Sequence, residues 1–139
     1  MMSGIRSKDT KPELQVRKAL HRKGYRYRLH DPKLPGKPDI VLPKYGAVIL
    51  VNGCFWHGHA CHLFKWPSTR KDFWRSKITR NAEKDRETSD ALTAAGWRVL
   101  VVWECALRGR HRLEFDSLVN QIVDWLCSEC DRDEIGGSD

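Results

Sequence analysis

Hydrophobic positions along the chain follow two patterns, one typical of amphipathic helices and one typical of buried strands. Residues 10–23, 69–96 and 115–126 show helical patterns. Residues 47–51 (AVILV) and 97–103 (WRVLVVW) are apolar on both faces, as the central strands of a sheet are. The pattern therefore predicts an α/β protein.

Shorter segments complete the expected sheet. Residues 25–30 and 39–42 are predicted strands, and the loop 31–38 between them holds three prolines and a glycine. The order helix, strand, strand hairpin, helix, strand, helix predicts a single domain over residues 1–139, with a small mixed sheet flanked by helices. The polar residues 131–139 are predicted to be a frayed tail.

Charge and composition narrow the class of protein. Lys and Arg number 25 against 18 Asp and Glu, which gives a net charge of +7 and favours a polyanionic partner such as nucleic acid. No apolar run approaches the ~18 residues of a membrane-spanning helix, and the N-terminal residues lack the apolar core of a signal peptide. We therefore expect a cytoplasmic protein, associated with the nucleoid in a bacterial cell, without membrane contacts.

The five cysteines indicate metal chemistry, because an odd number of thiols in a cytoplasmic chain argues against a disulfide framework. Segment 54–61 holds two cysteines and two histidines, of which His59 lies two residues before Cys61, and a third cysteine follows the strand 97–103. If that strand lies beside 47–51, the three cysteines and His59 can form a tetrahedral structural zinc site. A competing C-x-x-C pair at 127–130 lies at a helix end and in the polar tail, and we interpret it as free thiols. The predicted zinc ligands are Cys54, His59, Cys61 and Cys105.

Pro38-Asp39 lies at the start of a predicted strand. An acid in that place is where nucleases hold Mg²⁺, which prefers oxygen ligands and links a carboxylate to a phosphate. The pattern resembles part of the PD…(D/E)xK nuclease motif, but Val51-Asn52-Gly53 stands where that motif has an acid and a lysine. A backbone carbonyl would then be the second ligand, and another residue must act as the base. The alternative is that Asp39 is an ordinary loop acid.

The segment GCFWHGHACHLF at residues 53–64 supplies a candidate base and candidate DNA contacts. His57 is the candidate base, because a neutral imidazole on a loop held by zinc can take a proton from an attacking water. The alternative is that His57 only supports the loop or faces solvent. Phe55 and Trp56 form an aromatic pair on the same loop, suited to a wedge between base steps. The alternative is that they pack beneath the zinc site.

Longer segments resemble one family. GCFWHGHACHLFKWPSTRKDFW, GWRVLVVWECALRGR and LPGKPD are similar to motifs of the very-short-patch-repair (DNA mismatch) endonucleases, over nearly the whole chain from Met2 to about Cys127. The resemblance implies a restriction-endonuclease-like fold with structural Zn²⁺ and catalytic Mg²⁺. It also implies nicking of double-stranded DNA on the 5′ side of the T in T:G mismatches, which arise when 5-methylcytosine deaminates.

The resemblance assigns roles residue by residue. Asp39 matches the catalytic Mg²⁺ ligand, the Val51 carbonyl matches its second ligand, and His57 matches the catalytic histidine. Glu13 matches a supporting acid, although its place three residues after Thr10 also fits a helix capping box, and the two roles can coexist. The zinc ligands coincide with those predicted above. The implied DNA contacts are Met2, Phe55, Trp56, Lys77 and Asn81.

Two positions depart from the family. Asn52 stands where a known member has a second catalytic histidine, and an amide can form hydrogen bonds but cannot titrate. Met2 aligns with an intercalating methionine, yet the basic lead-in before that methionine is missing.

The expected partner is double-stranded DNA with a T:G mismatch, and mismatch-repair proteins are further candidates. We expect the enzyme to be a monomer. Two alternatives stay open. One is a nickase of this fold with a different specificity. The other is a zinc-stabilised DNA-binding module without catalysis.

Overall fold

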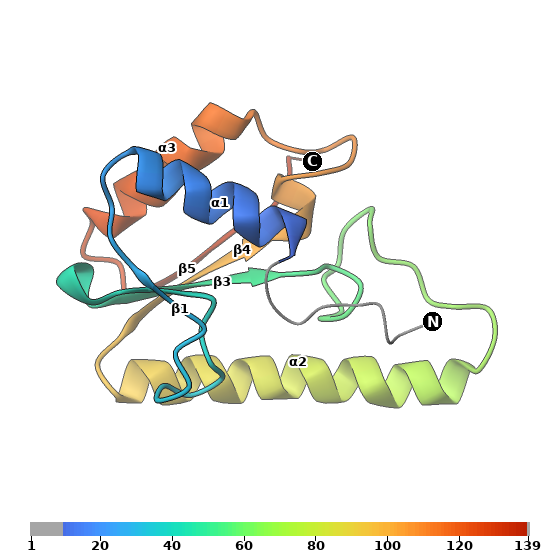
Figure 1. The fold of residues 1–139 in the computed structure, drawn as a ribbon. Helices are drawn as coiled ribbons and strands as arrows, with labels where there is room; N and C mark the ends of the chain where they lie inside the picture. The colour runs from blue at the N-terminus through green and yellow to red at the C-terminus, as the bar shows by residue number, and fades with distance from the viewer. Residues whose placement is uncertain (1–9, 139) are drawn as a thin grey trace.

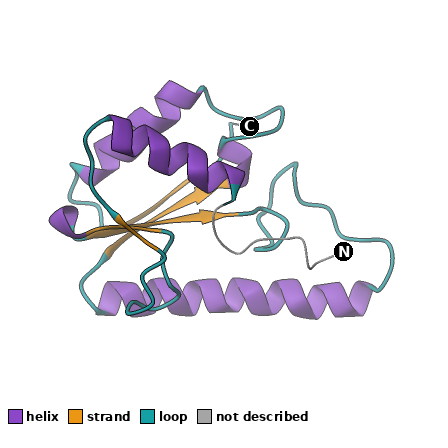
Figure 2. Ribbon diagram, viewed as in Figure 1, coloured by secondary structure: helices purple, strands orange, loops and turns teal. Residues whose placement is uncertain are grey.

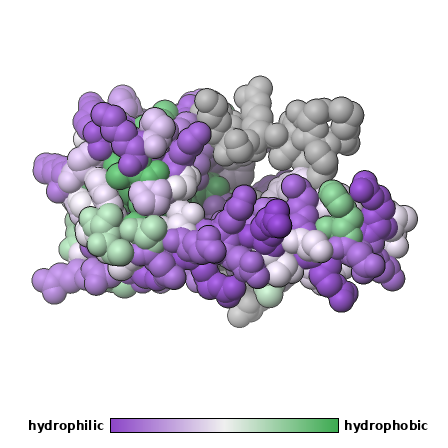
Figure 3. Space-filling model, turned by 90° about the horizontal axis from the view of Figure 1, so that it is seen from below, coloured by the Kyte–Doolittle hydropathy of each residue, from purple (hydrophilic) through white to green (hydrophobic). Residues whose placement is uncertain are grey.

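The computed structural model describes residues 10–138, in which helices cover both faces of one sheet (Figures 1 and 2). Helices α1 (Lys11–Arg22) and α3 (Phe115–Leu126) lie together on one face. Helix α2 (Lys71–Ala94) runs along the other, and the surface on that side is mostly hydrophilic (Figure 3). Within the described chain, no helix has both the length and the apolar character needed to cross a bilayer.

The five strands lie in chain order across the sheet. The second strand is antiparallel to both of its neighbours, whereas the last three strands are parallel. The predicted mixed sheet flanked by helices is therefore confirmed. The strands are β1 (Arg28–Leu29), β2 (Ile40–Leu42), β3 (Ala47–Asn52), β4 (Arg98–Trp103) and β5 (Arg132–Ile135).

The two central strands are buried on both faces, as their apolar runs predicted. Ile49 and Leu100 pack in the core under α1 and α3, whereas Val48 and Val99 pack with Leu92 of α2. β3 and β4 are parallel and in register to their last residues. The segments that follow them therefore start side by side, which brings residues distant in sequence to one edge of the sheet.

The C-terminal residues 131–139 are not a frayed tail over the part that the structure describes, and that prediction was wrong. Residues Arg132–Ile135 form β5 alongside β4, and Ile135 is only 6% exposed. This segment has one apolar position, and it forms a strand at the edge of the sheet. Backbone hydrogen bonds to β4 hold it, and a hydrophobic pattern does not report those bonds.

Three boundaries also differ from the pattern. The first strand is limited to β1, and Asp39 precedes β2 instead of lying within it. Helix α2 begins after Arg70, which has a left-handed backbone (φ 52°) and no side-chain cap. The predicted cap of α1 is confirmed, because the Glu13 N–H donates to the Thr10 hydroxyl at 3.4 Å.

Candidate active site and metal centre

Four soft or borderline ligands meet beyond the ends of β3 and β4, at the start of the loop and of the short helix that follow these strands. Their ligand atoms all lie within 4.8 Å of one another. The thiol sulfurs of Cys54 and Cys105 are 3.5 and 3.6 Å from Nδ1 of His59. Bonds of about 2.3 Å to sulfur and 2.1 Å to nitrogen around a tetrahedral zinc ion place such atoms about 3.6 Å apart. The structure brings together the four predicted ligands Cys54, His59, Cys61 and Cys105, and the set fits zinc.

Protonation of this cluster is coupled to metal binding. Burial raises the pKa of the Cys54 and Cys105 thiols, and burial lowers the pKa of His59. The protein alone therefore keeps the thiols neutral, whereas a coordinated metal ion deprotonates them.

The C-terminal segment forms one wall of this metal centre. The Gly137 N–H donates to the Cys105 sulfur at 3.2 Å. The ring of His59 stacks on Trp103 with centroids 4.1 Å apart, and the Trp103 indole N–H donates to Glu134 of β5 at 2.6 Å. The segment that holds Glu134 and Gly137 thus contacts the Cys105 ligand and the Trp103 ring on which His59 stacks.

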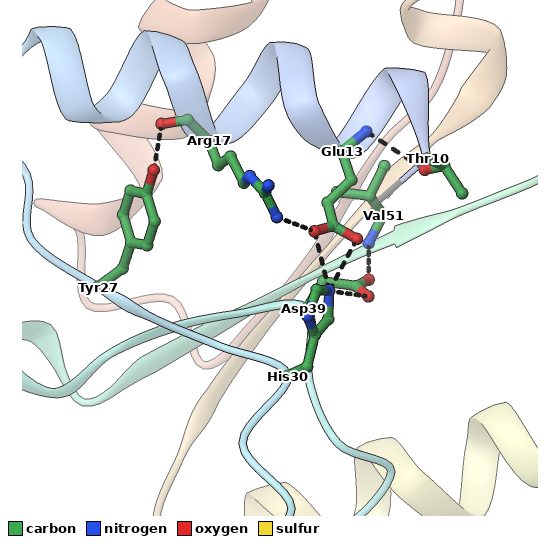
Figure 4. Close-up of polar contacts among 7 residues, drawn as sticks. All are labelled: Thr10, Glu13, Arg17, Tyr27, His30, Asp39 and Val51. Carbon is green, nitrogen blue, oxygen red and sulfur yellow. Dashed lines mark hydrogen bonds and ion pairs between the residues drawn. The ribbon is translucent and has the colours of Figure 1, made fainter. Parts of the chain in front are cut away.

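A second cluster gathers two carboxylates and an imidazole between α1 and the sheet (Figure 4). Glu13 comes from α1, His30 follows β1, and Asp39 precedes β2. His30 Nε2 lies 2.9 and 3.1 Å from the two Glu13 oxygens and 3.9 Å from Asp39 Oδ1. The Val51 N–H donates to Asp39 Oδ2 at 2.8 Å, so the carboxylate is attached to the end of β3.

The environment of this cluster favours a cation. Glu13 is 1% exposed and forms a 2.9 Å ion pair with Arg17. Burial raises the pKa of Asp39 to about 7, and the neighbouring Glu13 carboxylate adds to the rise. Two carboxylates this close and this buried are stabilised by a shared divalent ion with oxygen preference, so the donor set fits Mg²⁺.

His57 and Asn52 lie on the other side of the end of β3. Val51 packs against the core under α1, while the next residue, Asn52, lines a cavity of about 510 Å³ between the sheet and α2. His57 lines the same cavity, and its Nδ1 is hydrogen-bonded to the carboxylate of Asp85 on α2. The imidazole is therefore held by a carboxylate and is not a member of the Asp39 cluster.

The predicted aromatic wedge residues belong to a larger aromatic group. Phe55 and Trp56 each contact Trp74 of α2, with ring centroids 5.5 and 5.7 Å apart. The Asn81 side chain donates to the Trp56 carbonyl at 2.9 Å, which links this loop to α2. Lys77, one turn earlier on α2, is exposed.

Two residues of the site were missed in the sequence. His30 was assigned to a strand, and Asp85 was one of many charges on a long polar helix. The spacing of neither residue signals its role. Of the other predicted residues, Met2 lies outside the described residues, and Cys127 and Cys130 are exposed thiols.

Comparison with known proteins identifies a family for this chain. The family model described as DNA mismatch endonuclease Vsr matches residues 1–63. The chain is 46% identical to the DNA mismatch endonuclease Vsr of Escherichia coli over 92% of this chain and 82% of that protein. It is 50% identical to the type II nicking enzyme V.XorIIP of Xanthomonas oryzae pv. oryzae over 82% of this chain and 84% of that protein. A similar enzyme from Neisseria meningitidis, V.NmeAIP, is 46% identical over 89% and 90% of the two chains.

The fold is α/β, and it carries a carboxylate cluster at the ends of its strands and a thiol-rich candidate metal centre. Together with these relatives, these features define an endonuclease. The chain belongs to the Vsr family of DNA mismatch endonucleases.

Proposed function

We propose that this protein nicks double-stranded DNA at T:G mismatches, on the 5′ side of the mispaired T, by Mg²⁺-dependent hydrolysis of one phosphodiester bond. The observation that carries the proposal is the Asp39 carboxylate, held by the Val51 N–H at the end of β3 with Glu13 beside it. Membership of the Vsr family supports the same reaction.

In this proposal Asp39 and the Val51 carbonyl hold Mg²⁺, and Glu13 supports them from α1. When bound, Mg²⁺ supplies a Lewis acid that polarises the phosphate and lowers the pKa of a water ligand. Zn²⁺ at the Cys54, His59, Cys61 and Cys105 centre is structural, because four protein ligands leave no open coordination position.

His57 acts as the general base. A neutral imidazole with the Nδ1 proton directed at Asp85 presents Nε2 as the acceptor of a proton from the attacking water. Asp85 fixes this tautomer and the ring orientation, as the acid of a catalytic triad does. Asn52 lines the same cavity and can form hydrogen bonds to a phosphate or a water without titrating. The DNA strand would pass across the end of β3, between the Asp39 cluster and His57.

Mismatch selectivity is assigned to the loop and helix beside the site. Phe55 and Trp56 would separate base steps, and this costs least at a weakly stacked T:G pair. The metal centre on one side and Asn81 on the other hold the loop, so little ordering entropy is lost on binding. Lys77 is exposed on the same helix for contact with the mispaired bases.

A nick-mapping experiment tests the proposal. The zinc-loaded protein is incubated with Mg²⁺ and an end-labelled duplex that has one T:G pair, beside a duplex with T:A at that position. We expect one nick 5′ of the T in the mismatched duplex only, and no nick with Asp39→Asn. Equal cutting of both duplexes would identify a nickase of different specificity, and binding without any nick would identify a DNA-binding module.

A further inference from the structure

His30 lies inside the carboxylate cluster, although the proposed reaction gives it no task. Its Nε2 is 2.9 Å from Oε2 of Glu13, 3.1 Å from Oε1 of Glu13 and 3.9 Å from Oδ1 of Asp39 (Figure 4). Ligand atoms about 2.1 Å from an octahedral ion lie about 3.0 Å apart when adjacent and about 4.2 Å apart when opposite. The imidazole nitrogen is therefore at the spacing of adjacent ligands from Glu13, and its 3.9 Å separation from Asp39 Oδ1 lies between the adjacent and the opposite spacing.

The two carboxylates are fixed in a way that points toward the imidazole. Arg17 holds Oε2 of Glu13 at 2.9 Å, and the Val51 N–H holds Oδ2 of Asp39 at 2.8 Å. Both Glu13 oxygens and Oδ1 of Asp39 lie on the His30 side. The His30 backbone N–H donates to the Asp39 carbonyl at 3.2 Å, so the segment that carries the ring is attached directly to Asp39.

We propose that His30 is a nitrogen ligand of the cation that Asp39 holds, and that it makes this site bind Mn²⁺ more tightly than Mg²⁺. The inference rests on the proposed function, because it concerns the same cation site. A neutral imidazole with its proton on Nδ1 offers a lone pair at Nε2. Nitrogen ligands favour transition-metal ions, whereas sites made only of carboxylates, carbonyls and water suit Mg²⁺.

A different role for the same geometry is a hydrogen bond alone. In that case Nε2 carries the proton, donates it to Glu13 and orients that carboxylate without touching the metal. The variant His30→Gln separates the two roles, because a glutamine amide keeps an N–H donor for Glu13 but offers no imidazole nitrogen.

The experiment uses full-length, zinc-loaded protein, in which the thiol-rich centre is already filled. Mn²⁺ and Mg²⁺ affinities are measured by calorimetry, and electron paramagnetic resonance of bound Mn²⁺ detects a directly bonded nitrogen. We expect nitrogen coupling in the wild type and in His57→Gln, and its loss in His30→Gln. We also expect His30→Gln to lower Mn²⁺ affinity about tenfold or more and Mg²⁺ affinity much less.

The outcomes keep the two proposals distinguishable. Nitrogen coupling that persists in His30→Gln, or equal loss of Mn²⁺ and Mg²⁺ affinity, overturns the role of His30 and leaves the proposed active site standing. The variant Asp39→Asn should abolish Mn²⁺ binding at this site. Unchanged Mn²⁺ affinity in Asp39→Asn would place the ion elsewhere and overturn both the proposed catalytic site and the role of His30.

Discussion

The backbone N–H of Val51 donates a 2.8 Å hydrogen bond to Oδ2 of Asp39, which attaches a carboxylate from the start of one strand to the end of the next. This contact holds the acid at the edge where β3 and β4 end together. The neighbouring residue, Asn52, faces the opposite side of the sheet. The candidate reaction site is therefore divided by the last residues of β3.

The burial of Asp39 predicts a pH-dependent stability. Its pKa rises from 3.8 to about 7 in the folded protein, so its contribution to stability is fully present below 3.8 and is lost as the pH rises through about 7. Without added divalent cations, Asp39→Asn should stabilise the protein, and the gain should grow by about 2–3 kcal/mol from about pH 5 to about pH 8. Urea unfolding of both proteins at the two pH values measures it. A gain that is the same at both would contradict the buried, ionisable state of Asp39.

The contact between His57 and Asp85 predicts a positioning role for the acid. Asp85→Asn should reduce the single-turnover nicking rate by about 10–100-fold, because the imidazole loses the partner that fixes its tautomer. Zinc content and DNA affinity should stay unchanged. Asp90→Asn is the matched control, since Asp90 lies on the same helix, is exposed and pairs with Arg132. A full rate in Asp85→Asn, or an equal loss in Asp90→Asn, would remove this role.

The close approach of Gly137 to the metal centre predicts that it tolerates no side chain. A Cβ on Gly137 would lie 2.5 Å from the Cys105 carbonyl oxygen, whereas a Cβ on Gly136 would meet only an ordinary 3.6 Å contact with His59. Gly137→Ala should therefore destabilise the protein by on the order of 1–3 kcal/mol and speed zinc release to a colorimetric chelator. Gly136→Ala should do neither. If both variants release zinc at the wild-type rate, the C-terminal segment is not a wall of the metal centre.

The loop aromatics predict where mismatch selectivity resides. Trp56→Ala should lower the preference for T:G over T:A duplex by about one to two decades, the value of one base–aromatic stack. Trp66, which is 49% exposed and contacts Phe64, provides a comparison variant, and Trp66→Ala should change the preference less. Competition binding with both duplexes measures the effect, together with zinc content. A folded, zinc-loaded Trp56→Ala with full preference would contradict the wedge.

The sequence predicted the parts of the site that depend on local spacing. Three of the four predicted metal ligands lie within one short loop, and the parallel pairing of two apolar strands, on which the prediction depended, brings the fourth to them. His30 was missed because its position depends on the bend between β1 and β2, which brings it to Glu13 from a different element. Asp85 was missed because a charge on an exposed helix gives no sign of its partner. β5 was missed because its strand is held by backbone hydrogen bonds instead of an apolar face.

The most direct test of the central proposal is the ratio of single-turnover nicking rates on a T:G duplex and on a T:A duplex, measured with Mg²⁺ for the wild type and for Asp39→Asn. We predict fast nicking 5′ of the T on the T:G duplex, little nicking on the T:A duplex, and loss of both in Asp39→Asn while DNA binding persists. A nicking rate in Asp39→Asn equal to that of the wild type would contradict the assignment of Asp39 as the residue that holds the catalytic cation.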